Sequence, residues 1–216
     1  MIELERTVKE SIIDRLLLLY VIARTRQKGY NITGDVKLQK LLYKAEESMY
    51  LEGYKGLNYN FVRWEHGPFS QEVYVDTRDL IETGFLRSSQ GKAIDVSDQG
   101  VQLIEALQEI LSRNRKFEQI IDRVINEFGP YKGQKCKAVV YSYPKVGEKK
   151  PIKKVRKGEF ILQKLENSEA KDRFWIDEKW FETLEVLFDP ASYKSIKEGL
   201  KALKEEEGRP FVPVVE

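Results

Sequence analysis

Hydrophobic residues in the first part of the chain recur at spacings of three and four, which is the period of a helix. One such run covers residues 12–23 and is closed by Gly29, and a second covers residues 38–49 and is closed by Gly53. Because the first run is apolar on most sides, it predicts a buried helix at the centre of the fold.

The next segment mixes aromatic and β-branched residues and then breaks. Residues 59–64 are therefore expected to be extended. Pro68 fixes its own backbone and disfavours a helical residue before it, so residues 66–68 (His-Gly-Pro) predict a turn that breaks this strand. Ser70 is expected to cap the helix that follows.

Two short strands and another helix are expected after that. Ile94 and Val96 alternate with polar neighbours, as in a half-buried strand, and residues 88–92 form a polar turn before them. Ser97 is expected to cap a helix over residues 101–111. Helix, hairpin and capped helix are the layout of a winged helix-turn-helix. The expected fold is mainly α with a small β-hairpin: a winged-helix-like helical N-terminal domain and an α-rich C-terminal extension.

In the second half, a helical pattern over residues 117–128 ends at Gly129-Pro130. Residues 136–143 are β-branched and aromatic, and their pattern leaves helix and strand open. A lysine-rich loop is expected over residues 145–157. The remaining expected elements are an apolar segment and two helices, over residues 160–165, 178–188 and 191–206, the last ended by Gly208 and Pro210.

Charge divides the chain into three regions, although the formal net charge is only +2. Residues 1–114 hold 15 basic and 17 acidic residues, whereas residues 132–157 hold ten basic residues and one acid. Residues 159–216 hold nine basic and fourteen acidic residues. We therefore expect a helical domain over residues 1–128, a basic joint over residues 129–158 and an acidic helical region over residues 159–216.

Composition excludes several classes of protein. The 24 aromatic residues are more than a disordered chain carries. The longest apolar run, residues 16–23, is too short to span a membrane, and Glu3 and Glu5 do not suit a signal peptide, so a cytoplasmic protein is expected. Single Cys136 and His66 residues give neither a disulfide framework nor an ordinary zinc site, and no cofactor or metal is expected.

The residues with reactive side chains do not form a catalytic set. His66 can act as a base or make a structural hydrogen bond at a helix start. Cys136 lies between two lysines, which would lower the pKa of its thiol, but no base is near it in the sequence. The carboxylate pairs are expected to be solvated helix faces: Glu46 with Glu47, and Asp76 with Asp79. We therefore expect no enzymatic activity.

The basic joint is the strongest signal for nucleic-acid binding. Its tyrosines, at positions 131, 141 and 143, are interleaved with lysines, a mixture that suits phosphate contact with base stacking. A solvated linker, or a surface for an acidic protein, would have the same composition. The candidate nucleic-acid-binding residues are Lys132, Lys135, Lys149, Lys150, Lys153, Lys154 and Arg156.

A DNA-reading winged helix is harder to reconcile with the sequence. In such folds the helix before the wing usually enters the major groove. Here that helix carries four carboxylates against the single cation Arg78, and phosphates would repel them. These carboxylates are Glu72, Asp76, Asp79 and Glu82.

Three stretches together resemble the Panacea, or SocA-like, antitoxin domain and the related uncharacterised YwgA-type proteins. They are Lys-Leu-Gln-Lys-Leu-Leu-Tyr at residues 37–43, Phe-Val-Arg-Trp-Glu-His-Gly-Pro-Phe-Ser at 61–70, and residues 80–86. The resemblance covers roughly residues 10–112 and implies a mostly helical, non-enzymatic domain that binds a partner toxin. The motif residues that it singles out are Lys37, Leu38, Gln39, Lys40, Tyr43, Trp64, His66, Gly67 and Pro68.

The last expected helix resembles the toxin-wrapping end of short antitoxins, which often run through a Gly-Leu step to a final Gly-Arg. Ile196, Leu200 and Leu203 form one stripe, so an acidic amphipathic helix can lie in a groove on a basic toxin. Packing on its own domain is the alternative. The leading hypothesis is thus an antitoxin that acts by protein binding. The alternative is a winged-helix transcriptional regulator that binds nucleic acid, such as operator DNA, through the lysine-rich segment 132–157. The oligomeric state is left open.

Overall fold

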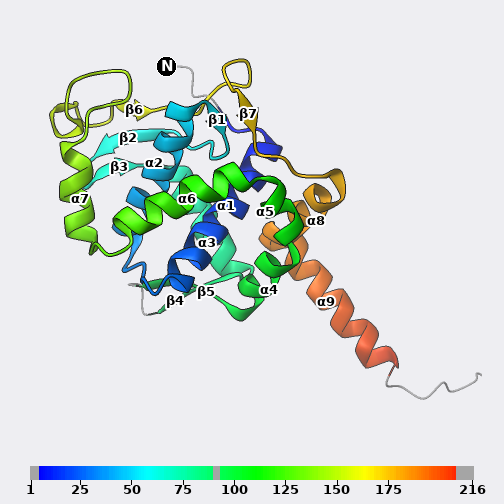
Figure 1. The fold of residues 1–216 in the computed structure, drawn as a ribbon. Coiled ribbons are helices and arrows are strands. Elements are labelled where there is room, and N and C mark those ends of the chain that lie inside the picture. Colours follow the sequence, from blue (N-terminus) through cyan, green and yellow to red (C-terminus); the bar gives the residue numbers. More distant parts are fainter. Residues whose placement is uncertain (1–4, 90–92, 208–216) are drawn as a thin grey trace, which may run out of the picture.

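A computed structural model describes residues 5–89 and 93–207, and its long helix α1 (Val8–Gln27) runs through the middle of the fold (Figure 1). Thr7 and Glu10 form a reciprocal capping box at its start. Leu16, Leu17 and Leu19 are fully buried, because other elements cover almost every side of the helix. The prediction of a central buried helix is confirmed.

Three helices pack together on one side of this centre. They are α2 (Asp35–Glu52), α6 (Arg115–Phe128) and α7 (Gly133–Ser142). Gly53 ends α2 in the left-handed conformation, with φ 77°, as its position in the sequence predicted. The stretch for which the pattern left helix and strand open lies almost entirely within α7.

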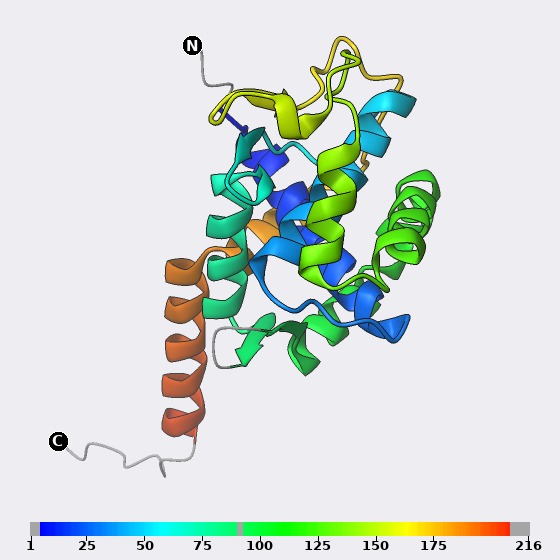
Figure 2. The same ribbon diagram turned by 90° about the vertical axis from the view of Figure 1, so that its left-hand side faces the viewer.

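The expected helix, hairpin and capped helix are all present. They are α3 (Gln71–Glu82), β4 (Leu86–Ser89) paired with β5 (Ala93–Val96), and α4 (Asp98–Ala106), whose cap Ser97 accepts from the Gly100 amide. The helix expected over residues 101–111 breaks at Leu107 and continues as α5 (Gln108–Arg113). The C-terminal helix α9 lies alongside α3, the helix that a winged-helix DNA reader would insert into DNA (Figure 2).

A three-stranded sheet has the order β3-β2-β6, with β2 (Phe61–Trp64) between β3 (Gly67–Phe69) and β6 (Phe160–Leu162). β2 and β3 form a tight hairpin in which Trp64 lies opposite Gly67. The expected break at residues 66–68 is therefore wrong in part, because Pro68 belongs to a strand. A proline fits there since β3 is an edge strand.

The C-terminal region folds back onto the rest of the chain. β6 pairs with β2, and β7 (Asp172–Arg173) pairs with β1 (Tyr54–Lys55). A short 3-10 helix, η1 (Ile152–Lys154), lies in the lysine-rich loop. Two helices follow, α8 (Glu178–Phe188) and α9 (Pro190–Glu207), close to their predicted bounds, while the expected stop at residues 208 and 210 lies outside the described residues.

The described chain is thus mainly helical with small sheets, and none of its helices is long and apolar enough to cross a membrane.

Candidate partner-binding surfaces

The polar residues of the motif helix α2 point into the protein. Lys37 is buried and donates to the carbonyl oxygens of Asn31 and Gly129, each at 2.7 Å. Gly129 is the C-terminal cap of α6, so the ammonium group lies where the helix dipole is negative. Lys37 therefore joins α2 to the end of α6.

Gln39 and Lys40 fix the start of α3. Gln39 accepts from the Ser70 amide and donates to the Ser70 carbonyl, both at 2.9 Å. Lys40 donates to the Pro68 carbonyl at 2.7 Å. The Ser70 side chain does not cap α3 as predicted, because its hydroxyl donates to the Glu72 carboxylate instead.

We expect Gln39→Ala to lower the free energy of unfolding by about 2 kcal/mol, since a buried amide and carbonyl of Ser70 would each lose their partner. Urea denaturation measures the change. Gln102→Ala, at an exposed position of α4, is the matched control and should change stability by less than about 0.5 kcal/mol. A loss no larger than that of the control would show that Gln39 does not hold this junction.

The burial of Lys40 also predicts that the stability of the folded protein depends on pH. Burial lowers the pKa of its ammonium group to about 7. The unfolded chain therefore binds a proton that the folded protein releases between about pH 7 and 10.5, so stability rises with pH across this window. Lys40→Met should remove about 2 kcal/mol of the rise between about pH 7 and 9, measured by urea denaturation. Parallel pH profiles of the two proteins would contradict this prediction.

The other motif residues of α2 are also internal. Leu38 and Tyr43 are buried, and the Tyr43 ring packs edge-on against Phe61 with centroids 5.3 Å apart. Tyr43 donates to Glu47 at 2.9 Å. The five motif residues of α2 thus shape the domain from inside and do not themselves face a partner in this structure.

The exposed part of the motif is the tip of the β2–β3 hairpin, which we call the hairpin tip (residues 64–66). Trp64 is 42% exposed, and Glu65 and His66 form the turn. His66 is not at a helix start as predicted, and its Nδ1 lies 3.1 Å from Lys137 Nζ. Gly67 is buried with φ 100°, a conformation that favours glycine.

The structure brings the hairpin tip and the basic joint together, which the sequence did not predict. Tyr141 of α7 donates to the carbonyl oxygens of Trp64 and Glu65, at 2.9 and 3.0 Å. Lys157 pairs with Glu65 at 2.7 Å and lies 4.3 Å from the ring centroid of Trp64. The candidate nucleic-acid-binding residues are all exposed: Lys132, Lys135, Lys149, Lys150, Lys153, Lys154 and Arg156.

Cys136 is not activated as its lysine neighbours suggested. Its side chain is buried in α7, and burial raises the pKa of the thiol to about 11 despite the nearby charges of Lys37 and Lys40. A buried, protonated thiol is a packing group and a poor nucleophile.

The expectation of solvated carboxylates is wrong for both pairs. Glu46 and Glu47 are buried, as are Asp76 and Asp79. Asp76 accepts from Arg6 at 2.7 Å, from Arg15 at 3.0 Å and from the Tyr59 hydroxyl at 3.0 Å.

This correction changes the DNA-binding argument. Arg15 also pairs with Asp79 at 2.8 Å and donates to the Phe188 carbonyl at the end of α8. Asp76 and Asp79 are therefore neutralised inside the protein and do not present negative charge to a phosphate. The objection based on four solvated carboxylates no longer stands. The position of α9 beside α3 now argues against insertion of α3 into DNA.

Helix α9 is docked at its start and exposed beyond it. The Tyr193 ring lies 5.8 Å from that of Phe85, and its hydroxyl is hydrogen-bonded to Gln99. Ile196, Leu200 and Leu203, the α9 stripe, are 46%, 55% and 58% exposed. Figure 1 shows this part of α9 extending away from the rest of the fold.

The charge of α9 differs from the acidic helix that the sequence suggested. Over its whole length α9 carries four lysines and four glutamates, and lysines outnumber glutamates three to one as far as residue 203: Lys194, Lys197, Lys201 and Glu198. The excess of acid in the C-terminal region therefore lies elsewhere.

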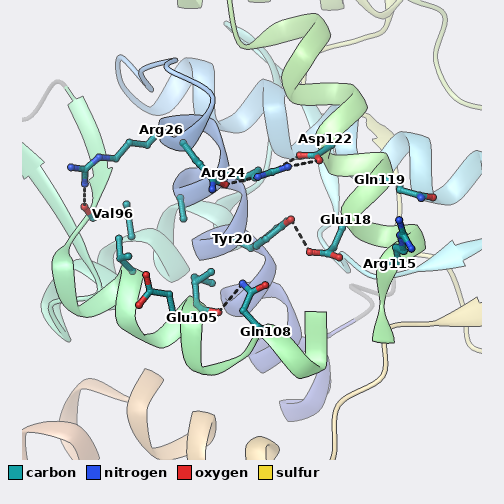
Figure 3. A pocket seen from close by; sticks show the side chains of 14 residues that line it. Tyr20, Arg24, Arg26, Val96, Glu105, Gln108, Arg115, Glu118, Gln119 and Asp122 are labelled. Atoms are coloured by element: carbon teal, nitrogen blue, oxygen red, sulfur yellow. Dashed lines mark hydrogen bonds and ion pairs between the residues drawn. The ribbon is translucent and has the colours of Figure 1, made fainter. Parts of the chain in front are cut away.

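A pocket of about 630 Å³ between α1, α4 and α6 has a polar lining (Figure 3). Its charged groups are largely paired within the protein: Tyr20 donates to Glu118 at 3.0 Å, and Arg24 pairs with Asp122 at 2.7 Å. It holds no base beside a nucleophile. Across the described ranges there is also no group of three or more potential metal ligands.

Comparison with known proteins identifies the domain. Residues 38–144 match the family model described as antitoxin SocA-like, Panacea domain, and a search of curated proteins found no match. The matched segment includes the α2 motif from Leu38 onward, the hairpin tip and α7, and it ends before β6, α8 and α9. The chain therefore carries an antitoxin SocA-like Panacea domain.

Proposed function

We propose that this protein is the antitoxin of a toxin–antitoxin pair and that it neutralises its toxin by binding, without catalysis, in the cytoplasm. The Panacea domain match is the observation that carries this proposal. The hairpin tip is a candidate contact with the toxin, in addition to the α9 stripe, because it is the part of the family motif that reaches the surface.

The α9 stripe supports a binding mode in which the helix lies in a groove on the toxin. Its three side chains are spaced four and three residues apart, which places them on one face of the helix. In the protein alone this face is uncovered, whereas most apolar side chains of the described residues pack in the core.

Gly199 lies within the same stretch of α9 and gives independent support. Glycine in a helix interior costs about 1 kcal/mol relative to alanine. Nothing lies within 4 Å of the place that a Cβ atom would occupy, so the fold itself does not require glycine there. A close approach by a partner's backbone would require it. We infer a toxin groove with an apolar floor, a close contact at Gly199 and an acidic rim facing the lysines.

Co-expression with the product of the adjacent reading frame tests the proposal. We expect the neighbouring protein alone to arrest growth, this protein to restore it, and the two to co-purify as a complex. Rescue without a complex would contradict neutralisation by binding. A harmless neighbour that does not bind would contradict the antitoxin role for this gene pair.

A further inference from the structure

One end of the molecule carries a large excess of unpaired positive charge. Of the ten cations between residues 132 and 157, Lys145 pairs with Glu148 and Glu159, and Lys157 pairs with Glu65. The others make no ion pair within 4 Å to a carboxylate of the described chain. They are Lys132, Lys135, Lys137, Lys149, Lys150, Lys153, Lys154 and Arg156, which we call the basic end.

The fold gathers these cations on one side. α7 and the loop after it lie at the left of Figure 1, beside the ends of β2 and β3, and Figure 2 shows this side face-on. Arg63 of β2 adds to it: its guanidinium lies 5.8 Å from the Tyr141 ring, and its buried Nε has no hydrogen-bond partner. Three acids at this end, Glu65, Glu148 and Glu159, are already paired, and a fourth, Glu127, accepts a hydrogen bond from Tyr143.

The type of cation indicates the type of ligand. Seven of the eight residues of the basic end are lysines. Lysine is depleted in interfaces between proteins, whose contacts favour arginine and uncovered aromatic rings. A surface rich in lysine ammonium groups can bind a row of phosphates. Binding is favourable because the lysines neutralise the phosphates and release the counterions condensed on the nucleic acid.

The aromatic rings at this end already have a lysine near them, which the sequence did not predict. Lys135 lies 4.3 Å from the Tyr131 ring, Lys137 lies 5.7 Å from Tyr141 and Lys157 lies 4.3 Å from Trp64. Stacking of a nucleic-acid base would have to displace these cations. A duplex, whose bases are already stacked, needs only the phosphate contacts.

We propose that the basic end binds the phosphate backbone of duplex DNA without reading its sequence. The contact is distinct from the α9 stripe, so DNA and a toxin bound at that stripe would occupy separate surfaces. It also differs from the winged-helix mode, because α3, which α9 flanks, takes no part in it.

Fluorescence anisotropy with a labelled random-sequence duplex of about 20 base pairs tests this. If six to eight phosphates are neutralised, affinity should fall roughly 10³- to 10⁴-fold between about 50 and 200 mM salt. An affinity that does not respond to salt would overturn the proposal. So would tighter binding of a single strand, or equal competition by poly-glutamate, which would indicate an acidic polypeptide as the ligand.

Charge-reversal variants separate a local site from net charge. In the first variant, Lys149, Lys150, Lys153 and Lys154 become Glu, and the slope of log affinity against log salt should fall by about 3 to 4. The control reverses four exposed lysines elsewhere, Lys9, Lys116, Lys171 and Lys179, and changes net charge equally. Equal weakening by both variants would refute a site at the basic end. Toxin neutralisation should survive in the first variant, so the two proposals fail independently.

Discussion

Asp76→Asn should lower the free energy of unfolding by about 3–5 kcal/mol, the loss typical of removing one partner from a buried ion cluster. Asp76 is fully buried between two arginines and a tyrosine, which it joins through Arg6, Arg15 and Tyr59. Asparagine keeps the shape but removes the charge, so Arg6 and Arg15 lose the carboxylate that they share and keep Asp14, at 2.9 Å, and Asp79, at 2.8 Å, respectively, in a cluster that water reaches poorly.

Urea denaturation at neutral pH measures this loss. The control is Glu109→Gln, which removes the carboxylate from an exposed pair with Arg113 on α5. Such a pair contributes about 0.3–0.5 kcal/mol. If Asp76→Asn cost no more than the control, the cluster would contribute to specificity of the fold and little to its stability.

Replacing Ile196, Leu200 and Leu203 together by glutamine should abolish toxin neutralisation and co-purification, while thermal unfolding stays cooperative at an unchanged midpoint. Burying one such side chain contributes about 1.5–3 kcal/mol, so losing three weakens binding by at least a factor of 10³. The fold should not change, because these side chains are exposed in the protein alone.

The matched control replaces two exposed apolar residues outside α9, Val8 and Leu51, which are 58% and 67% exposed, by glutamine. This double variant should neutralise as well as the wild type. If the triple variant also neutralised the toxin, α9 would have no part in the mechanism, and the hairpin tip would become the main candidate contact.

The elements that could be predicted from the sequence are those whose signal is local. The apolar period of α1 and α2 and the glycines after them gave both helices, and Ser97 marked the start of α4. The bounds of α8 followed in the same way. Each of these rests on contacts or backbone preferences within a few residues, which a single sequence displays.

The buried charges could not be predicted, because their partners are distant in the chain. Asp76 pairs with residues 61 and 70 positions away, and Gln39 contacts Ser70 across 31. A carboxylate on a helix face looks the same in the sequence whether water or an arginine covers it. The motif singled out Lys40, but its burial and its bond to Pro68 could not be predicted for the same reason, since no local pattern indicates a carbonyl 28 residues away.

Predicting the surface at the hairpin tip would have required the sheet topology as well as the sequence. β6 returns beside β2, and this brings Lys157 onto Trp64 across 93 residues of chain. The motif and the basic joint were both visible in the sequence, but only the sheet order places them together.

The same strand order sets a delay during synthesis. Phe160 of β6 pairs with Val62 of β2, so 98 residues must be added before the sheet can close. At about 5–20 residues per second on the ribosome, the nascent chain carries β2 with one open edge for roughly 5–20 s. β3 can cover its other edge at once. An open edge recruits other strands, so in that interval the emerging chain is most exposed to mispairing, and a ribosome-bound chaperone would act there.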